Sequence, residues 1–186
     1  MGIALGVAEF KSIAVGLDML DKMTKTATIE IVDNRIVCIG KFLITVSGEV
    51  ADVQSAINRA KEETGSSLIA AEVIPSVMDG VIEKINARID RDNISSIGIF
   101  ETKTLSSGIL CANKIKKTSQ VELLRVSLTL GLGGKSLIVF TGDIASVKAA
   151  LEAAKGELSD KNELNKLVSD IAIASPSQSF IEKFNA

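Results

Sequence analysis

The sequence contains two cysteines and no histidine, so the chemistry available to its side chains is narrow. Without imidazole, the chain has no histidine zinc site, no histidine-containing triad and no imidazole proton relay. The two thiols belong to Cys38 and Cys111. No convergent set of acid, base and nucleophile can be assembled from the remaining residues, and we therefore expect a protein that is not an enzyme.

Charge and hydropathy restrict the partners. The 21 Lys and Arg residues against 23 Asp and Glu give a net charge of -2, and Trp and Tyr are absent. A basic field and aromatic stacking platforms are therefore missing, which argues against nucleic-acid binding. Charged residues interrupt every apolar stretch before the roughly 18 residues that a membrane span requires. The first residues lack the pattern of a signal peptide, and we expect a protein of a reducing cytosol.

The chain repeats itself at a spacing of about 92 residues. Gly6, Glu9, Lys11, Gly16 and Lys22 each recur 92 positions later, and ten further identities follow at a spacing of 94 between residues 40 and 61 and their counterparts. This period is far longer than that of solenoid repeats. The sequence therefore predicts two homologous domains, residues 1–90 and 91–186, which meet near the charged segment 88–93.

Each repeat has the same predicted order of elements. In the first, strands are expected at 3–10, 28–32, 35–39, 41–48 and 67–74, with one helix after Ser12 and another after Gly48. Pro75, and Pro176 in the second repeat, is expected to open a short terminal helix. This gives the β-α-β-β-α-β order of a ferredoxin-like domain, a two-layer α+β fold.

Longer stretches resemble a known family. The strings GVAEFKSIAVGLDMLDKMTKTATIEIV and GKFLITVSGEVADVQSAI, supported by VCIGKF, GLGGK and IPSVMDGVI, resemble the bacterial microcompartment (BMC) shell domain, most closely the unpermuted tandem-domain shell proteins. The resemblance covers essentially the whole chain. It implies a homotrimer that forms a pseudohexameric tile of a microcompartment shell in the bacterial cytoplasm. It also implies a central pore, lined by Val37, Ile39, Gly40, Gly131, Leu132, Gly133 and Gly134.

Cys38 is the residue of greatest interest. Its local sequence is compatible with a small apolar side chain at a strand end. In a trimer, however, one cysteine near the axis becomes three thiols. The resemblance implies that these thiols ligate one [4Fe-4S] cluster per trimer on the three-fold axis, for electron transfer across the shell or redox sensing with a lumenal or cytosolic redox protein. Ile39 stands where the relatives tend to carry proline, and Cys111 is predicted to be a core residue.

The loop from Gly131 to Ser136 ends in Gly-Lys-Ser, as a phosphate-binding loop does. Thr129 stands where that motif needs its first glycine, and a strand rather than a helix is expected after the loop. A nucleotide site is therefore not predicted. The glycines are compatible with backbone amides that face the pore, or with an ordinary turn.

Lys25 and Lys117 occupy equivalent places near the end of the first helix in each repeat. By itself, such a lysine is a solvated residue that favours the helix dipole. The resemblance places both at the tile edge, in contact with other shell proteins, although the arginine and histidine that usually follow the proline are absent after Pro75 and Pro176. Two alternatives remain open: a shell tile with a plain metabolite pore and no cluster, and a soluble ligand-sensing trimer.

Overall fold

The computed structural model describes residues 3–37, 40–128 and 133–184 of the chain. They form two compact units, Met1–Val77 and Met78–Ala186. The second unit begins at Met78, before the charged segment that predicted a boundary between residues 90 and 91. The Met78 N–H donates to Oδ1 of Asn113 at 2.8 Å, and Val81 is fully buried. These residues pack with the second unit, so the connector is part of it.

The first unit contains one antiparallel sheet and two helices. Its elements are β1 (Ala4–Phe10), α1 (Ile13–Thr26), β2 (Ile29–Val37), β3 (Lys41–Gly48), α2 (Val50–Glu63) and β4 (Leu68–Ile74). In the described residues, the strand order is β2-β3-β1-β4, which confirms the predicted ferredoxin-like arrangement. A single strand, β2, replaces the two strands expected at 28–32 and 35–39, and its register shifts between Ile31 and Asp33; residues 38 and 39 lie outside the described residues.

The second unit repeats this plan. Its elements are β5 (Ser96–Thr102), α3 (Leu105–Thr118), β6 (Glu122–Ser127), β7 (Ser136–Gly142), α4 (Ile144–Asp160), β8 (Leu167–Ala174) and α5 (Gln178–Lys183). Its sheet has the equivalent order, β6-β7-β5-β8, in the described part of the chain. The register shift of β2 recurs between Leu123 and Arg125 of β6. The duplication therefore extends to irregularities of the backbone.

The expected terminal helix forms in the second repeat, as α5, but turns replace it after Pro75. Gly80 has a φ of +87°, outside the range of a right-handed helix, and Asn86 has a φ of +53°. Separate hydrogen bonds, from the Val81 N–H to the Met78 carbonyl at 3.2 Å and from Ile85 to Ile82 at 3.1 Å, close these turns.

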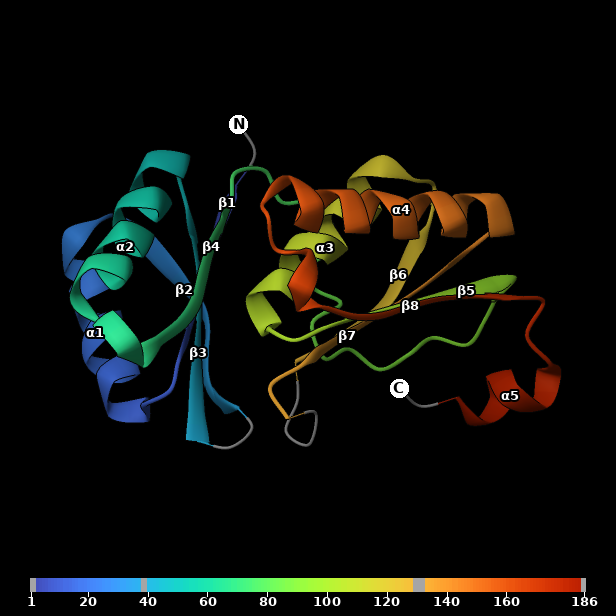
Figure 1. Cartoon of the computed structure of the whole chain (residues 1–186), viewed down its shortest axis with the longest axis horizontal. Helices are drawn as coiled ribbons and strands as arrows, with labels where there is room; N and C mark the ends of the chain where they lie inside the picture. Colours follow the sequence, from blue (N-terminus) through green and yellow to red (C-terminus); the bar gives the residue numbers. More distant parts are fainter. Residues whose placement is uncertain (1–2, 38–39, 129–132, 185–186) are drawn as a thin grey trace. The chain divides into compact units, whose positions relative to one another are not determined.

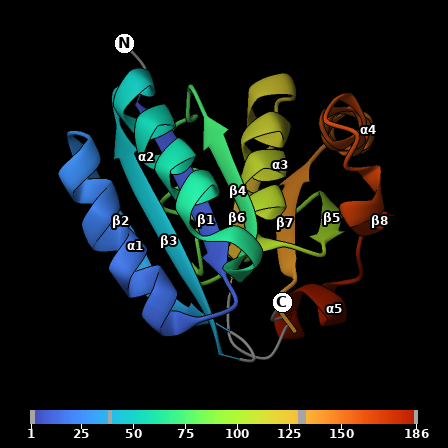
Figure 2. The same ribbon diagram turned by 60° about the vertical axis from the view of Figure 1, so that its left-hand side comes forward.

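Helices α1 and α2 cover one face of the first sheet, and α3 and α4 cover one face of the second (Figures 1 and 2). In the first unit, buried residues from β1, β3, α1 and α2 form a continuous apolar core between the two layers. Ser12 caps the start of α1 as predicted, because its hydroxyl accepts a hydrogen bond from the Val15 N–H at 3.4 Å. None of the helices in the described residues is long and apolar enough to cross a bilayer.

The second helices of the two units begin differently. Asp143 caps α4 by accepting from the N–H groups of Ala145 and Ser146, each at 2.9 Å, whereas the Glu49 side chain makes no capping bond to α2. A hydrogen bond from the Ser146 hydroxyl and the bond from the Ser146 N–H hold the pKa of Asp143 below its ordinary value. A carboxylate at the first helical turn is also favoured by the helix dipole.

Candidate functional site

The β2–β3 hairpin carries the predicted metal ligand. Val37, the last residue of β2, pairs with Lys41 and is 2% exposed. Gly40 is exposed and has a φ of +72°, a conformation that a residue with a side chain rarely adopts. Cys38 and Ile39 lie between these residues, outside the described residues. The described residues on either side of them end β2 and begin β3, which pair antiparallel.

The β6–β7 hairpin carries the second predicted loop at the equivalent place. Ser127 pairs with Leu137, and the predicted pore residues Gly131 and Leu132 lie outside the described residues. Gly133 and Gly134 have φ angles of +64° and +82°, and only Gly133 of these two is exposed. Both hairpins therefore use left-handed glycines beside the third strand of the repeat.

The residues after these glycines exclude a phosphate-binding loop of the helical kind. Ser136 begins strand β7, as predicted, and no helix follows the glycines directly. The Lys135 ammonium lies 3.1 Å from the Glu101 carboxylate of the neighbouring strand β5. We infer that Lys135 supports its loop through this ion pair, which the sequence repeat alone did not reveal.

Cys111 is a core residue, as predicted. It lies on α3, is fully buried, and its sulfur is 3.9 Å from the Ala154 carbonyl oxygen of α4. A thiol packed between two helices is a poor ligand for a metal centre at a hairpin tip. Among residues 3–37, 40–128 and 133–184, no group of three potential metal-binding side chains is present.

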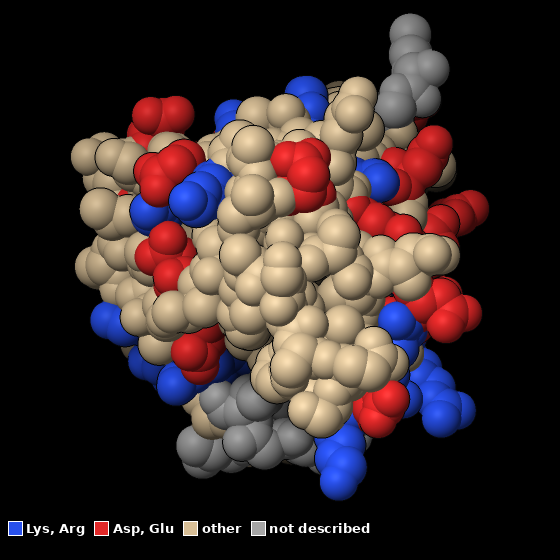
Figure 3. Space-filling view, turned by 90° about the vertical axis from the view of Figure 1, so that its right-hand side faces the viewer, with Lys and Arg blue, Asp and Glu red and all other residues tan. Residues whose placement is uncertain are grey.

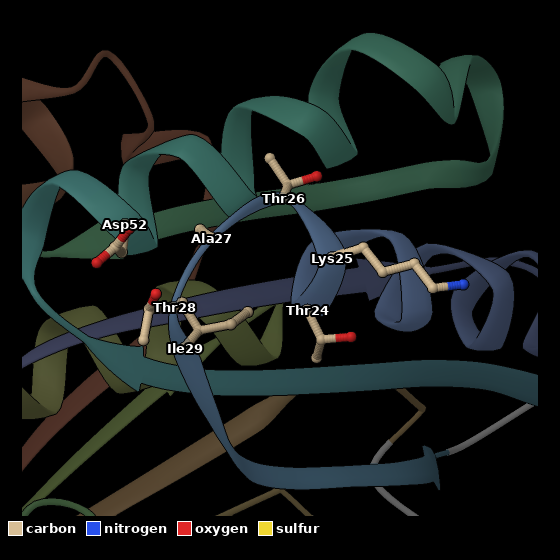
Figure 4. A pocket seen from close by; sticks show the side chains of 7 residues that line it. All are labelled: Thr24, Lys25, Thr26, Ala27, Thr28, Ile29 and Asp52. Carbon is tan, nitrogen blue, oxygen red and sulfur yellow. The ribbon is translucent and has the colours of Figure 1, made fainter.

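The two candidate edge lysines lie in the last turns of their helices. The Lys25 ammonium is 2.6 Å from the Asp21 carboxylate, and its side chain is 73% exposed. Thr24, Lys25, Thr26, Ala27, Thr28, Ile29 and Asp52 line an open hollow of about 490 Å³ at this end of α1. Figure 4 shows the Lys25 side chain extending away from Asp52. Lys117 is likewise exposed at the end of α3.

A second pair of repeated lysines has a structural role that the sequence did not indicate. Lys22 contacts Asp18 at 2.9 Å and Glu63 of α2 at 3.3 Å, and hydrogen bonds to these carboxylates raise its pKa. Its equivalent, Lys114, contacts Glu157 of α4 at 3.2 Å. In each unit, this lysine therefore links the two helices.

Comparison with known proteins identifies the repeated unit. The BMC domain model matches residues 4–77 and 96–176, one copy in each unit. The chain belongs to the BMC-domain family. The bacterial microcompartment shell protein PduT of Citrobacter freundii is 33% identical over 161 residues, which are 87% of this chain and 88% of that protein.

Other BMC-domain proteins match in sequence or structure. The carboxysome shell protein CsoS1 of Prochlorococcus marinus is 34% identical over 77 residues, 40% of this chain and 75% of that protein. A crystal structure of a microcompartment protein from Desulfitobacterium hafniense has a TM-score of 0.83 at 32% identity, covering 98% of this chain and 99% of that one. The fused permuted hexameric shell protein MSM0275 shares the fold, with a TM-score of 0.63 at 18% identity over 86% of this chain and 85% of that chain.

Proposed function

We propose that this chain is a structural, non-enzymatic shell protein of a bacterial microcompartment, and that three copies form a pseudohexameric tile in the shell within the bacterial cytoplasm. The match of BMC domains to both units carries this proposal. The similarity to PduT over most of both chains supports it, because that protein is a microcompartment shell protein. A trimer of two-domain chains presents six similar domains around one axis.

In such a tile, we infer that the β2–β3 and β6–β7 hairpins surround the pore. They occupy equivalent places in the two units, so a ring of six domains brings all of them to one axis. The left-handed glycines Gly40, Gly133 and Gly134 support tight loops without bulky side chains. The outer ends of α1 and α3 are then available for contact with neighbouring shell proteins.

We further propose that Cys38 from three chains ligates a [4Fe-4S] cluster in this pore. The donor chemistry fits, because thiolates are the usual protein ligands of such clusters. The position in the chain also fits, because Cys38 lies between the end of β2 and the start of β3, whereas Cys111 is buried in the core. The cluster would supply one-electron transfer across the shell or redox sensing. Cys38 would hold it, and Val37, buried at the end of β2, would anchor the loop.

Anaerobic iron analysis tests this ligand assignment. We expect the purified wild-type protein to contain about four irons per three chains. Cys38→Ser is expected to lose nearly all of that iron and the associated visible absorbance, whereas Cys111→Ser is expected to retain them because that thiol is buried in the core. Iron retained equally by both variants would contradict the role of Cys38. A wild-type trimer without iron would instead support a plain metabolite pore.

The edge lysines are tested by assembly. Because the ion pair of Lys25 is exposed and Lys117 is exposed at the end of α3, Lys25→Ala and Lys117→Ala are expected to leave the melting temperature nearly unchanged. We expect each to raise severalfold the protein concentration needed to form extended layers of tiles, as measured by electron microscopy and sedimentation. Lys148→Ala, at another exposed lysine, serves as the control. Equal layer formation by all variants would show that these lysines are not edge contacts.

A further inference from the structure

The outer side of the first unit exposes apolar residues whose equivalents in the second unit are buried. On α1 and β2, four large apolar side chains are between 36% and 54% exposed: Leu17, Ile31, Val32 and Ile36. Their counterparts 92 residues later are at most 2% exposed: Ile109, Leu123, Leu124 and Leu128. One repeat therefore leaves open a surface that the other repeat covers.

The connector lies along one border of this surface on the second unit, at the edge of β6. At the open edge of β6, the Asn86 N–H donates to the Val126 carbonyl at 2.8 Å, and the Val126 N–H donates to the Lys84 carbonyl at 2.9 Å. The Asn86 side-chain oxygen also accepts from the Leu128 N–H at 2.7 Å. Val81 is fully buried. Residues 84–86 therefore close the edge of β6 with backbone hydrogen bonds, and Val81 is buried at the start of the same segment.

The sequence of this connector recurs at the end of the chain. Residues 81–87 read VIEKINA, and residues 180–186 read FIEKFNA, with five identities at a spacing of 99. The same spacing relates β4 to β8, because Glu72 pairs with Val7 and Ile171 pairs with the equivalent Ile99. Asn185 and Ala186 lie outside the described residues. The match thus continues the structural repeat beyond the last strand.

The two segments also have the same local hydrogen bonds. The Phe180 N–H donates to the Ser177 carbonyl at 3.0 Å, as Val81 donates to Met78. The Phe184 N–H donates to the Ile181 carbonyl at 3.3 Å, as Ile85 donates to Ile82. Phe180 differs in burial, because it is 38% exposed whereas its counterpart Val81 is buried. The second segment therefore shares these two hydrogen bonds with the connector, although it is helical as α5 where the connector forms turns, and it leaves its leading apolar residue exposed.

We propose that residues 180–184 of one chain dock on the open edge of β2 in a second copy of the chain, as residues 81–85 dock on β6. By the repeat, the Lys183 carbonyl would accept from the Asn34 N–H, and the Lys183 ammonium would lie near Glu30. Phe180 would cover the exposed apolar residues of α1 and β2. The second unit also exposes the apolar residues Leu164, Val168 and Ile171. In Figure 3, residues other than Lys, Arg, Asp and Glu occupy much of the face shown.

This contact joins the end of one chain to the beginning of the next. Because the two surfaces differ, the contact is heterologous and produces a ring when the rotation closes. The inference rests on the proposed shell tile, for which it names the segment that connects the chains. It also gives the exposed apolar residues of α1 and β2 in the first unit a partner, Phe180 from the second unit of another chain.

Photo-crosslinking of the full chain tests the docking. Protein with p-benzoylphenylalanine at position 180 is mixed in equal amounts as ¹⁴N- and ¹⁵N-labelled chains, irradiated and analysed by mass spectrometry. We expect links between position 180 and residues 29–37 of a chain with the other label. A trimer whose links stay within one chain, or reach another surface, would overturn the docking but leave the tile intact. A monomer without interchain links would overturn both proposals.

Sedimentation of variants gives a second measurement. Phe180→Asp and Asn34→Pro are expected to raise the concentration at which the assembly dissociates at least tenfold, because the first places a charge in the apolar contact and the second removes the edge N–H. The exposed neighbour Ser179→Ala is the matched control. Circular dichroism establishes that each variant is folded. Folded variants that assemble like the control would refute the docking.

Discussion

Gly108→Ala is expected to destabilise the second unit by about 3 kcal/mol, at the upper end of the usual cost of overpacking. An added Cβ would lie 1.8 Å from the Ser136 hydroxyl oxygen and 2.5 Å from the Ser136 Cβ. Neither atom can retreat easily, because Ser136 is fully buried at the start of β7 and its hydroxyl is hydrogen-bonded to Thr102 at 2.8 Å. Helix α3 would therefore have to move away from the sheet.

Gly156→Ala provides the matched control for this substitution. Gly156 also lies within a helix, α4, but an added Cβ would meet no atom within 4 Å. Alanine is expected there to stabilise the protein by roughly 0.5–1 kcal/mol through helix propensity. Far-UV circular dichroism is the appropriate measurement, because the chain has no Trp or Tyr. If both variants unfold at the same temperature, the tight contact between Gly108 and Ser136 does not exist.

Phe140→Ala is expected to cost about 3–5 kcal/mol, the range for removal of a buried aromatic ring. Phe140 is fully buried on β7 and pairs with Gly98 on β5. A Cβ at Gly98 would lie 2.2 Å from the ring, so Gly98→Ala alone should also destabilise the unit. In the double variant, the new methyl group would occupy space that the ring has left.

A double-mutant cycle of these two positions measures their coupling. We expect the double variant to be more stable than the sum of the single effects predicts, by about 1 kcal/mol or more. The measurement is the unfolding free energy of all four proteins in denaturant, followed by circular dichroism. Additive effects would mean that the ring does not rest on the Gly98 backbone.

The repeat and the hydrophobic periodicity were sufficient to predict most of the fold. The order of strands and helices, the cap at Ser12 and the burial of Cys111 follow from local patterns that the structure confirms. Such patterns indicate which side of each helix or strand faces the core and which side faces water. They predicted β2 as two strands, because the shift in register after Ile31 interrupts its alternation.

The connector was harder to predict, because its structure depends on distant residues. A proline followed by an apolar segment favours a short helix, but Gly80 and the hydrogen bonds of Asn86 to β6 select turns instead. Of the candidate site, the positions of Val37, Gly40, Lys25 and Lys117 are described, whereas Cys38 lies outside the described residues. Its role as a ligand depends on other chains and stays a proposal.

The different residues that pack against the equivalent glycines Gly16 of α1 and Gly108 of α3 have a consequence for correct folding. In the first repeat, Phe10 pairs with Phe42, and in the second Thr102 pairs with Ser136. A strand exchanged between the repeats would set a phenyl ring beside a hydroxyl that has lost its partner, which is unfavourable in a buried site. Tandem homologous domains are prone to misassembly. Here the dissimilar pairs would bias each half of the chain toward its own strands during synthesis.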